Sequence, residues 1–173
     1  VEYRIYDPTE DPFDPEGGTV VIEGTYYDQR LEFPDPDAGL PWGLQHVLRR
    51  QVAGTYWLSF ELPGAPTLYS THRYGADGTT MWSNQMAFGH VIGTKATPAY
   101  GEYRFTGLRE SEALWIALGF DLDGAPLYAE RITAVARWDH DFASAEGEFV
   151  WRRYDLTLDE DPLDPEDGML MGE

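Results

Sequence analysis

The fold class is decided by the stretch GTYWLSFEL, residues 54–62, in which apolar and polar side chains largely alternate. Tyr56, Leu58 and Phe60 fall on one face of an extended chain, whereas a threonine, a serine and a glutamate fall on the other. A period of two residues is typical of a β-strand with one buried and one solvated face. The stretch therefore predicts a half-buried β-strand.

Comparable runs follow along the chain, and each ends at a short connection rich in Gly, Asp and Pro. Such connections join antiparallel neighbours. A series of this kind indicates a meander, and closing it would remove its exposed edges. We therefore predict an all-β fold, an antiparallel up-and-down barrel of about eight strands. The predicted strands are Thr19–Phe33, Gly54–Leu62, Pro66–Tyr74, Thr79–Phe88, Ala99–Thr106, Glu112–Asp121, Pro126–Trp138 and Glu146–Leu156.

One short helix is predicted, Pro41–Gln51, and we expect it to cap one end of the barrel. Leu44, Val47 and Leu48 fall on one side of this helix, and its proline suits a first helical turn. The flanking regions are acidic and rich in proline. The predicted organisation is an N-terminal arm at residues 1–18, a barrel domain at residues 19–157 and a tail at residues 158–173.

The two ends of the chain share a repeat, because Glu10–Glu16 and Glu160–Glu166 both read Glu-Asp-Pro-x-Asp-Pro-Glu. Proline fixes φ and withholds a hydrogen-bond donor, so both segments are expected to be extended arms outside the sheet. Their carboxylates could bind Ca²⁺, although the spacing is not that of an EF-hand. Solvated tails with one anchoring side chain, Phe13 or Leu163, are the favoured interpretation.

The charge of the chain limits its partners. Its 173 residues include 31 acidic and 12 basic side chains, for a formal net charge of −19. This field repels nucleic acid and anionic membranes, so we expect neither as a partner. The composition is typical of proteins from saline surroundings and equally of ordinary acidic cytosolic proteins. No signal peptide or run of about 20 apolar residues is recognisable, which predicts a cytoplasmic protein and leaves secretion open.

Several chemistries have no support in the sequence. The absence of cysteine excludes disulfides and thiolate metal sites. The four histidines lack metal-ligand spacing, and no nucleophile elbow or phosphate-binding glycine loop is present. We therefore expect neither a metal nor a cofactor.

Residues 54–156 resemble the lipocalin-like (calycin) barrels, including small bacterial barrels related in shape to allene oxide cyclase. The resemblance lies in Gly54-Thr55-Tyr56 after a short helix, in the Tyr74–Thr79 hairpin, in Gly101–Arg104 and in the Phe120–Gly124 turn. It implies a barrel with an internal cavity. It implies no particular activity, because these barrels include transporters, binding proteins, cyclases and isomerases.

Meander topology indicates which end of the barrel is open, since successive loops alternate between the ends. The helix and the Gly75–Gly78 turn are expected to share the closed end. The long loop Gly89–Pro98 then becomes a lid over the open mouth, through His90, Val91 and Ile92. An ordinary connecting loop is the alternative.

Three residues are candidates for proton transfer. If Tyr74 points inward, His72 does so too, and could act as a general acid or base or be a hydrogen-bonded core residue. Glu130 alternates with Tyr128, and burial would raise its pKa, although the register of this strand leaves a surface position open. Tyr103 is the third, because a tyrosine hydroxyl can polarise a carbonyl group. Arg131, Arg137 or Arg152 could be a buried partner for Glu130.

The predicted contacts with a ligand are mainly aromatic, and the same side chains could instead fill a solid core. They are Tyr56, Phe60, Leu68, Ser70, Tyr74, Trp82, Asn84, Met86, Phe88, Trp115, Tyr128 and Trp151.

Three functions are consistent with this pattern. The first is binding of a hydrophobic small molecule in the barrel by a cofactor-independent cyclase or isomerase, whose aromatic walls stabilise developing positive charge. The second is a lipocalin-type carrier without chemistry. The third is a structural domain in which Thr19–Phe33 reaches across a partner in a homodimer.

Overall fold

The strand pattern is visible in the computed structural model, which describes residues 2–5, 14, 16, 19–23, 33, 35, 37–60, 67–84, 94–158 and 160–172. The chain forms two compact units, Val1–Leu31 and Glu32–Glu173. In the first unit, β1 (Glu2–Ile5) pairs antiparallel with β2 (Thr19–Glu23). The prediction that Thr19–Phe33 adds a strand to the barrel is therefore wrong for Thr19–Glu23, the described part of this range. These residues form β2, which pairs with β1 in a separate two-stranded sheet.

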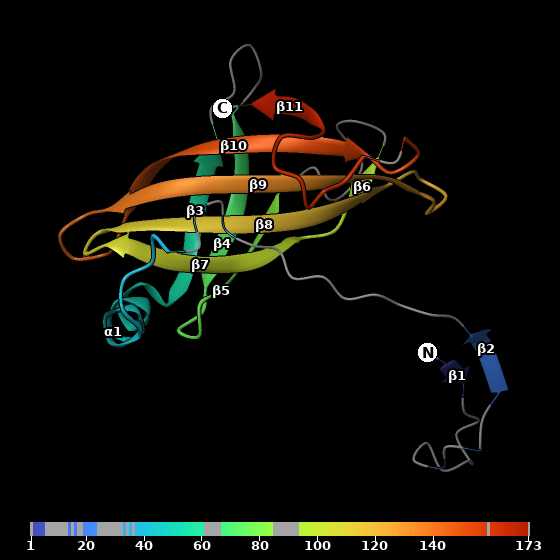
Figure 1. Ribbon diagram of the computed structural model, residues 1–173, viewed down its shortest axis with the longest axis horizontal. Helices are drawn as coiled ribbons and strands as arrows, with labels where there is room; N and C mark the ends of the chain where they lie inside the picture. The colour runs from blue at the N-terminus through green and yellow to red at the C-terminus, as the bar shows by residue number, and fades with distance from the viewer. Residues whose placement is uncertain are drawn as a thin grey trace. The chain divides into compact units, whose positions relative to one another are not determined.

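The second unit is a nine-stranded antiparallel sheet with the order β11-β10-β9-β8-β7-β5-β4-β3, and β6 pairs with β8 (Figure 1). The predicted meander is confirmed. Its elements are α1 (Trp42–Val52), β3 (Gly54–Phe60), β4 (Leu68–Tyr74), β5 (Thr79–Asn84), β6 (Lys95–Ala96), β7 (Ala99–Gly107), β8 (Glu110–Phe120), β9 (Pro126–Trp138), β10 (Ala145–Asp155) and β11 (Met169–Gly172).

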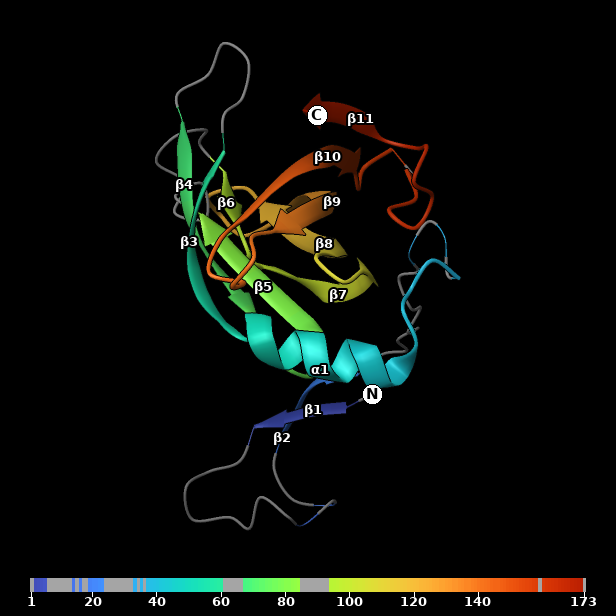
Figure 2. The ribbon, with the colours of Figure 1, turned by 90° about the vertical axis from the view of Figure 1, so that its left-hand side faces the viewer.

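The sheet curls through 191° and forms a half-barrel, which is compatible with a calycin-like fold. Strands β3 and β4 stand opposite β10 across its concave side (Figure 2). Closing a barrel requires a hydrogen-bonded ladder between its first and last strands. Among the described residues, β3 pairs only with β4, and the second edge of β10 pairs with β11, so this ladder is not formed.

Helix α1 lies at the same end of the half-barrel as the Gly75–Gly78 turn, as predicted. Arg49 donates hydrogen bonds to the carbonyl oxygens of Asp77 and Tyr103, at 3.2 and 3.0 Å, and so connects the helix to β7 and to this turn. The side of the helix that faces the sheet agrees with the prediction at Leu48 and differs from it at Leu44 and Val47. Leu44 and Val47 are exposed, whereas Gln45, Leu48 and Val52 are buried.

The burial of Gln45 has a backbone cause. β5 pairs with β7 only as far as Glu102, which leaves Phe105 without a strand partner on that side. The Gln45 amide and the Leu40 backbone take the place of the missing strand. Gln45 Nε2 donates to the Phe105 carbonyl at 2.7 Å, the Leu40 N–H donates to the same carbonyl at 2.8 Å, and the Phe105 N–H donates to Gln45 Oε1 at 2.8 Å. Buried backbone N–H and C=O groups need hydrogen-bond partners. The polar Gln45 is therefore buried, although the apolar pattern of the helix predicts burial of Leu44 and Val47 instead.

Pro162 and Leu163 lie on the convex face of the sheet, where the Arg131 side chain donates hydrogen bonds to their carbonyl oxygens. The prediction of an extended arm at Glu160–Glu166 is wrong, because residues 162–163 and 165–166 form turns and β11 follows them. The Asp side chains of the repeat explain the turns: Asp164 accepts the N–H of Glu166, and Asp14 accepts that of Glu16. In the described part of the chain, no group of three potential metal ligands occurs.

Candidate functional site

An open groove of about 870 Å³ runs along the concave side of the half-barrel, between the β3 edge and the β9–β10 hairpin. Its floor is formed by inner-face side chains of β4, β5, β8 and β9, and its rim by residues 56–59 and 143–149. Alternation along the strands places aromatic side chains on this face. The predicted contact residues that line the groove are Tyr56, Tyr74, Trp82 and Trp115, together with His72.

His72 lies at the floor of the groove, with 5% of its surface exposed. Its Nε2 lies 2.8 Å from the Thr80 hydroxyl, which also receives the Trp115 indole N–H at 3.3 Å and donates to the Arg73 carbonyl at 3.0 Å. A hydroxyl has one hydrogen, so these bonds form together only when His72 Nε2–H is a donor and Nδ1 is the acceptor nitrogen. Burial lowers the pKa of His72 from 6.5 to about 4, and the ring is neutral at pH 7.

Packed tyrosine and tryptophan rings close the helix end of the groove. Tyr74 makes edge contacts with Tyr56, Tyr103 and Trp138 at centroid distances of 5.7, 4.8 and 5.2 Å. The Tyr103 hydroxyl donates to the Gly75 carbonyl at 2.8 Å, and burial raises the pKa of Tyr103 above its usual value. Tyr103 is fully buried and does not line the groove, which gives it a structural position at the closed end.

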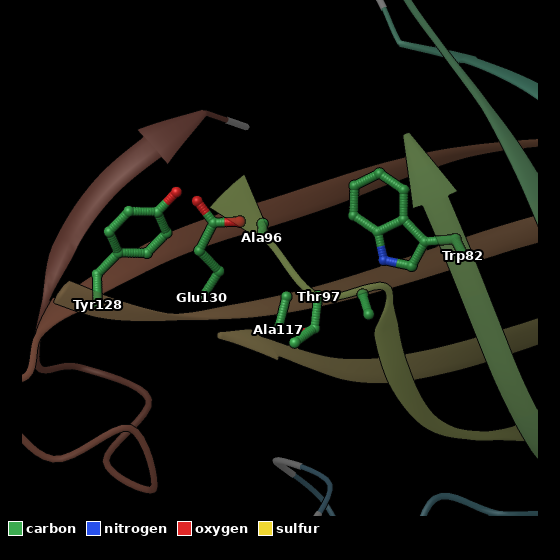
Figure 3. Close-up of a pocket in the computed structure, with 7 residues that line it drawn as sticks. Trp82, Ala96, Thr97, Ala117, Tyr128 and Glu130 are labelled. Atoms are coloured by element: carbon green, nitrogen blue, oxygen red, sulfur yellow. The ribbon is translucent and has the colours of Figure 1, made fainter. Parts of the chain in front are cut away.

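A second, small cavity lies beyond Trp82, toward the other end of the sheet. It has a volume of about 10 Å³, which is room for about one water molecule. Tyr128 and Glu130 project into it from β9, and Trp82 borders it from β5 (Figure 3). The Tyr128 hydroxyl lies 3.1 Å from the Thr94 hydroxyl, which connects β9 to the residue before β6.

Glu130 points to the inner face, which resolves the ambiguity of its register. It is buried, and its Oε1 accepts hydrogen bonds from Arg153 Nη2 at 2.6 Å and Arg153 Nε at 3.2 Å. The Arg153 guanidinium also lies over the Tyr128 ring, 4.0 Å from its centroid. Burial raises the pKa of Glu130, and the hydrogen bonds and positive charge of Arg153 oppose this effect.

Sequence reasoning missed Arg153 as the partner of Glu130 and favoured Arg131, Arg137 or Arg152. Arg153 stands directly opposite Glu130 in the β9–β10 register, whereas Arg131 points to the convex face. Thr80 and Trp138 were missed as well. Thr80 lies two residues before Trp82, and Trp138 two residues after Ala136, so each shares the inward face of its strand. This spacing could have identified them only together with the register between the strands.

The remaining predicted residues fall into three groups. Ser70 is 4% exposed, and its hydroxyl has no hydrogen-bond partner among the described residues; Trp151 is buried in the core. Phe60, Leu68 and Asn84 belong to β3, β4 and β5, and their side chains lie outside the described part of the structure. The remaining positions lie outside the described residues altogether: Met86, Phe88, His90, Val91 and Ile92.

Within the described ranges, no helix is long and apolar enough to cross a membrane. No protein-family model, curated protein or solved structure matches the chain.

Proposed function

We propose that the concave face of the half-barrel binds a small, largely apolar molecule in the groove beside His72. The main support is the groove itself, because it combines a volume of about 870 Å³ with aromatic walls and one buried histidine. Protein sites for small molecules are commonly concave, mostly apolar and equipped with a few orienting polar groups. A relationship to the calycin barrels is part of this proposal, with the half-barrel left open along the groove.

A carrier without chemistry is the form of this function that the geometry favours. Two of the three candidates for proton transfer are engaged elsewhere, Tyr103 with the Gly75 carbonyl and Glu130 with Arg153. Neither of them lines the groove that contains His72. A reaction that moves a proton between two positions of a ligand needs groups that converge on it, and His72 stands alone among the three.

A cofactor-independent cyclase or isomerase is the second candidate, and His72 is the observation in its favour. A buried histidine with a lowered pKa in a groove is a recognised mark of catalytic sites. The third candidate, a homodimer bridged by Thr19–Phe33, gains no support from β2, which pairs with β1 of its own chain.

The binding proposal is tested with Nile red, an uncharged dye that fluoresces in apolar surroundings. Ala136→Trp places a large ring in the groove, and Thr133→Trp places the same ring on the convex face of the same strand. We expect the wild type and Thr133→Trp to bind the dye equally, and Ala136→Trp to lose most of the binding. Equal binding by all three proteins, or none by the wild type, would reject the proposal.

Catalysis is distinguished from carriage by deuterium exchange. Small molecules that copurify with the protein are extracted and incubated in D₂O with wild type or with His72→Gln. Their mass is then measured by mass spectrometry, where incorporated deuterium appears as a mass increase. A carrier leaves carbon-bound hydrogen unexchanged in both. Exchange or a rearranged product that depends on His72 would establish the cyclase or isomerase instead.

A further inference from the structure

The charges and rings around the groove indicate the chemical class of its ligand. Seven aromatic residues line its floor, walls and rim: Tyr56, Trp57, Tyr74, Trp82, Trp115, Trp138 and Phe149. Neither lysine nor arginine is found among its described lining residues. An anionic ligand would therefore enter this groove without a counter-charge, at a large desolvation cost.

The ionisable groups at the groove favour a positive ligand. His72 at the floor is neutral at pH 7 because burial lowers its pKa, so it does not repel a cation. Glu146 and Glu148 belong to the rim and are exposed. The whole chain carries a net charge of −19, which attracts cations toward the opening.

Two arginines of this unit already lie over tyrosine rings, in cation–π contacts. The guanidinium of Arg153 lies 4.0 Å from the centroid of the Tyr128 ring, and that of Arg49 lies 5.7 Å from the centroid of the Tyr103 ring. Both arginines also have other partners: Arg153 forms an ion pair with Glu130, and Arg49 donates hydrogen bonds to backbone carbonyl oxygens. Tyrosine rings of the same kind, those of Tyr56 and Tyr74, line the groove.

We propose that the ligand of the groove is an organic cation, an ammonium group that carries apolar substituents. The faces of tryptophan and tyrosine rings attract such a cation through their quadrupoles, and more strongly where water is excluded. This inference rests on the proposed function, since it assigns a chemical class to the molecule bound in the same groove.

The test compares three molecules of nearly equal shape and different charge. They are choline, its uncharged carbon analogue 3,3-dimethylbutan-1-ol, and the anion 3,3-dimethylbutanoate. Binding to the full chain is followed at pH 7 through the indole N–H signals in ¹⁵N NMR spectra. We expect choline to shift the signals of Trp82 and Trp115, and to bind at least about tenfold more tightly than the alcohol.

A pair of variants locates the effect. Phe149→Leu removes a half-buried ring from the groove, and Trp42→Leu removes an exposed ring from α1, where Trp42 stacks on His46. We expect Phe149→Leu to weaken choline binding more than binding of the alcohol, and Trp42→Leu to change neither. The folded state of each variant is checked from its backbone NMR signals.

Other outcomes overturn the inference. Binding of the alcohol that equals or exceeds that of choline, or preference for the anion, contradicts a cation site while leaving the binding function intact. Failure of choline to shift any groove signal also contradicts it. Failure of the wild type to bind Nile red is a separate result, and it would reject the binding function itself.

Discussion

Glu130 and Arg153 face each other across the β9–β10 ladder on the concave side of the sheet, with 2.6 Å between Glu130 Oε1 and Arg153 Nη2. Their side chains are only 8% and 22% exposed. A buried pair of this kind contributes little net stability, but loss of one partner leaves an uncompensated charge.

The first prediction concerns this pair. Arg153→Met should lower the free energy of unfolding by about 3 kcal/mol, because Glu130 would remain buried without its counter-charge. Urea unfolding at pH 7 measures the effect. The double variant Glu130→Gln/Arg153→Met should recover most of the loss. Additive losses in the double variant would show that the two residues do not interact energetically.

The second prediction concerns the pH dependence that His72 confers. The unfolded chain binds a proton at this residue below pH 6.5, whereas the folded protein resists protonation until about pH 4. The contribution of neutral His72 is therefore complete above pH 6.5 and is lost as the pH falls toward 4, by up to about 3 kcal/mol. Urea unfolding at several pH values measures this dependence.

His72→Gln is the control for that dependence, because it retains a hydrogen-bonding group for Thr80 and does not titrate. The carboxylates titrate equally in both proteins, so the difference between the two curves isolates His72. It should appear between pH 6.5 and 4. Parallel curves over that interval would contradict the lowered pKa.

The third prediction reverses an expectation from the helix pattern. Gln45→Leu adds an apolar side chain at a buried position, yet it should lower stability by about 2 kcal/mol because the N–H of Phe105 loses its acceptor. Leu44→Gln, the matched change at the neighbouring exposed position, should alter stability by less than about 0.5 kcal/mol. Thermal unfolding of both variants measures the two changes in stability. A larger loss of stability in Leu44→Gln than in Gln45→Leu would contradict this account and support the apolar face predicted from the sequence.

The sequence supports prediction of the strands and of their inward faces, because both follow from a local period of two residues. Ser70, His72 and Tyr74 are all buried on the concave side, as their alternation indicates. Strand ends at β8, β9 and β10 fall within two residues of the predicted limits. The helical spacing of apolar residues leads to the error at α1, because the hydrogen-bonding need of the Phe105 backbone outweighs the apolar character of Leu44 and Val47.

Closure and pairing depend on contacts between distant segments, which a period cannot predict. Thr19–Glu23 has the composition of a barrel strand, but Glu2–Ile5 is its partner, while Met169–Gly172 supplies the last strand of the main sheet. The Glu130–Arg153 pair likewise follows from a register between β9 and β10. The groove exists because the curled sheet leaves β3 and β10 apart, and no local pattern contains that information.

The central claim, that the concave groove binds a small molecule, is tested most directly by intermolecular NOEs from a bound ligand. Nile red, as the uncharged probe, should give NOEs to the indole protons of Trp115 and Trp82, which line the groove, and none to exposed Trp42 on α1. NOEs to Trp42 alone, or to no tryptophan of the groove, would contradict the account.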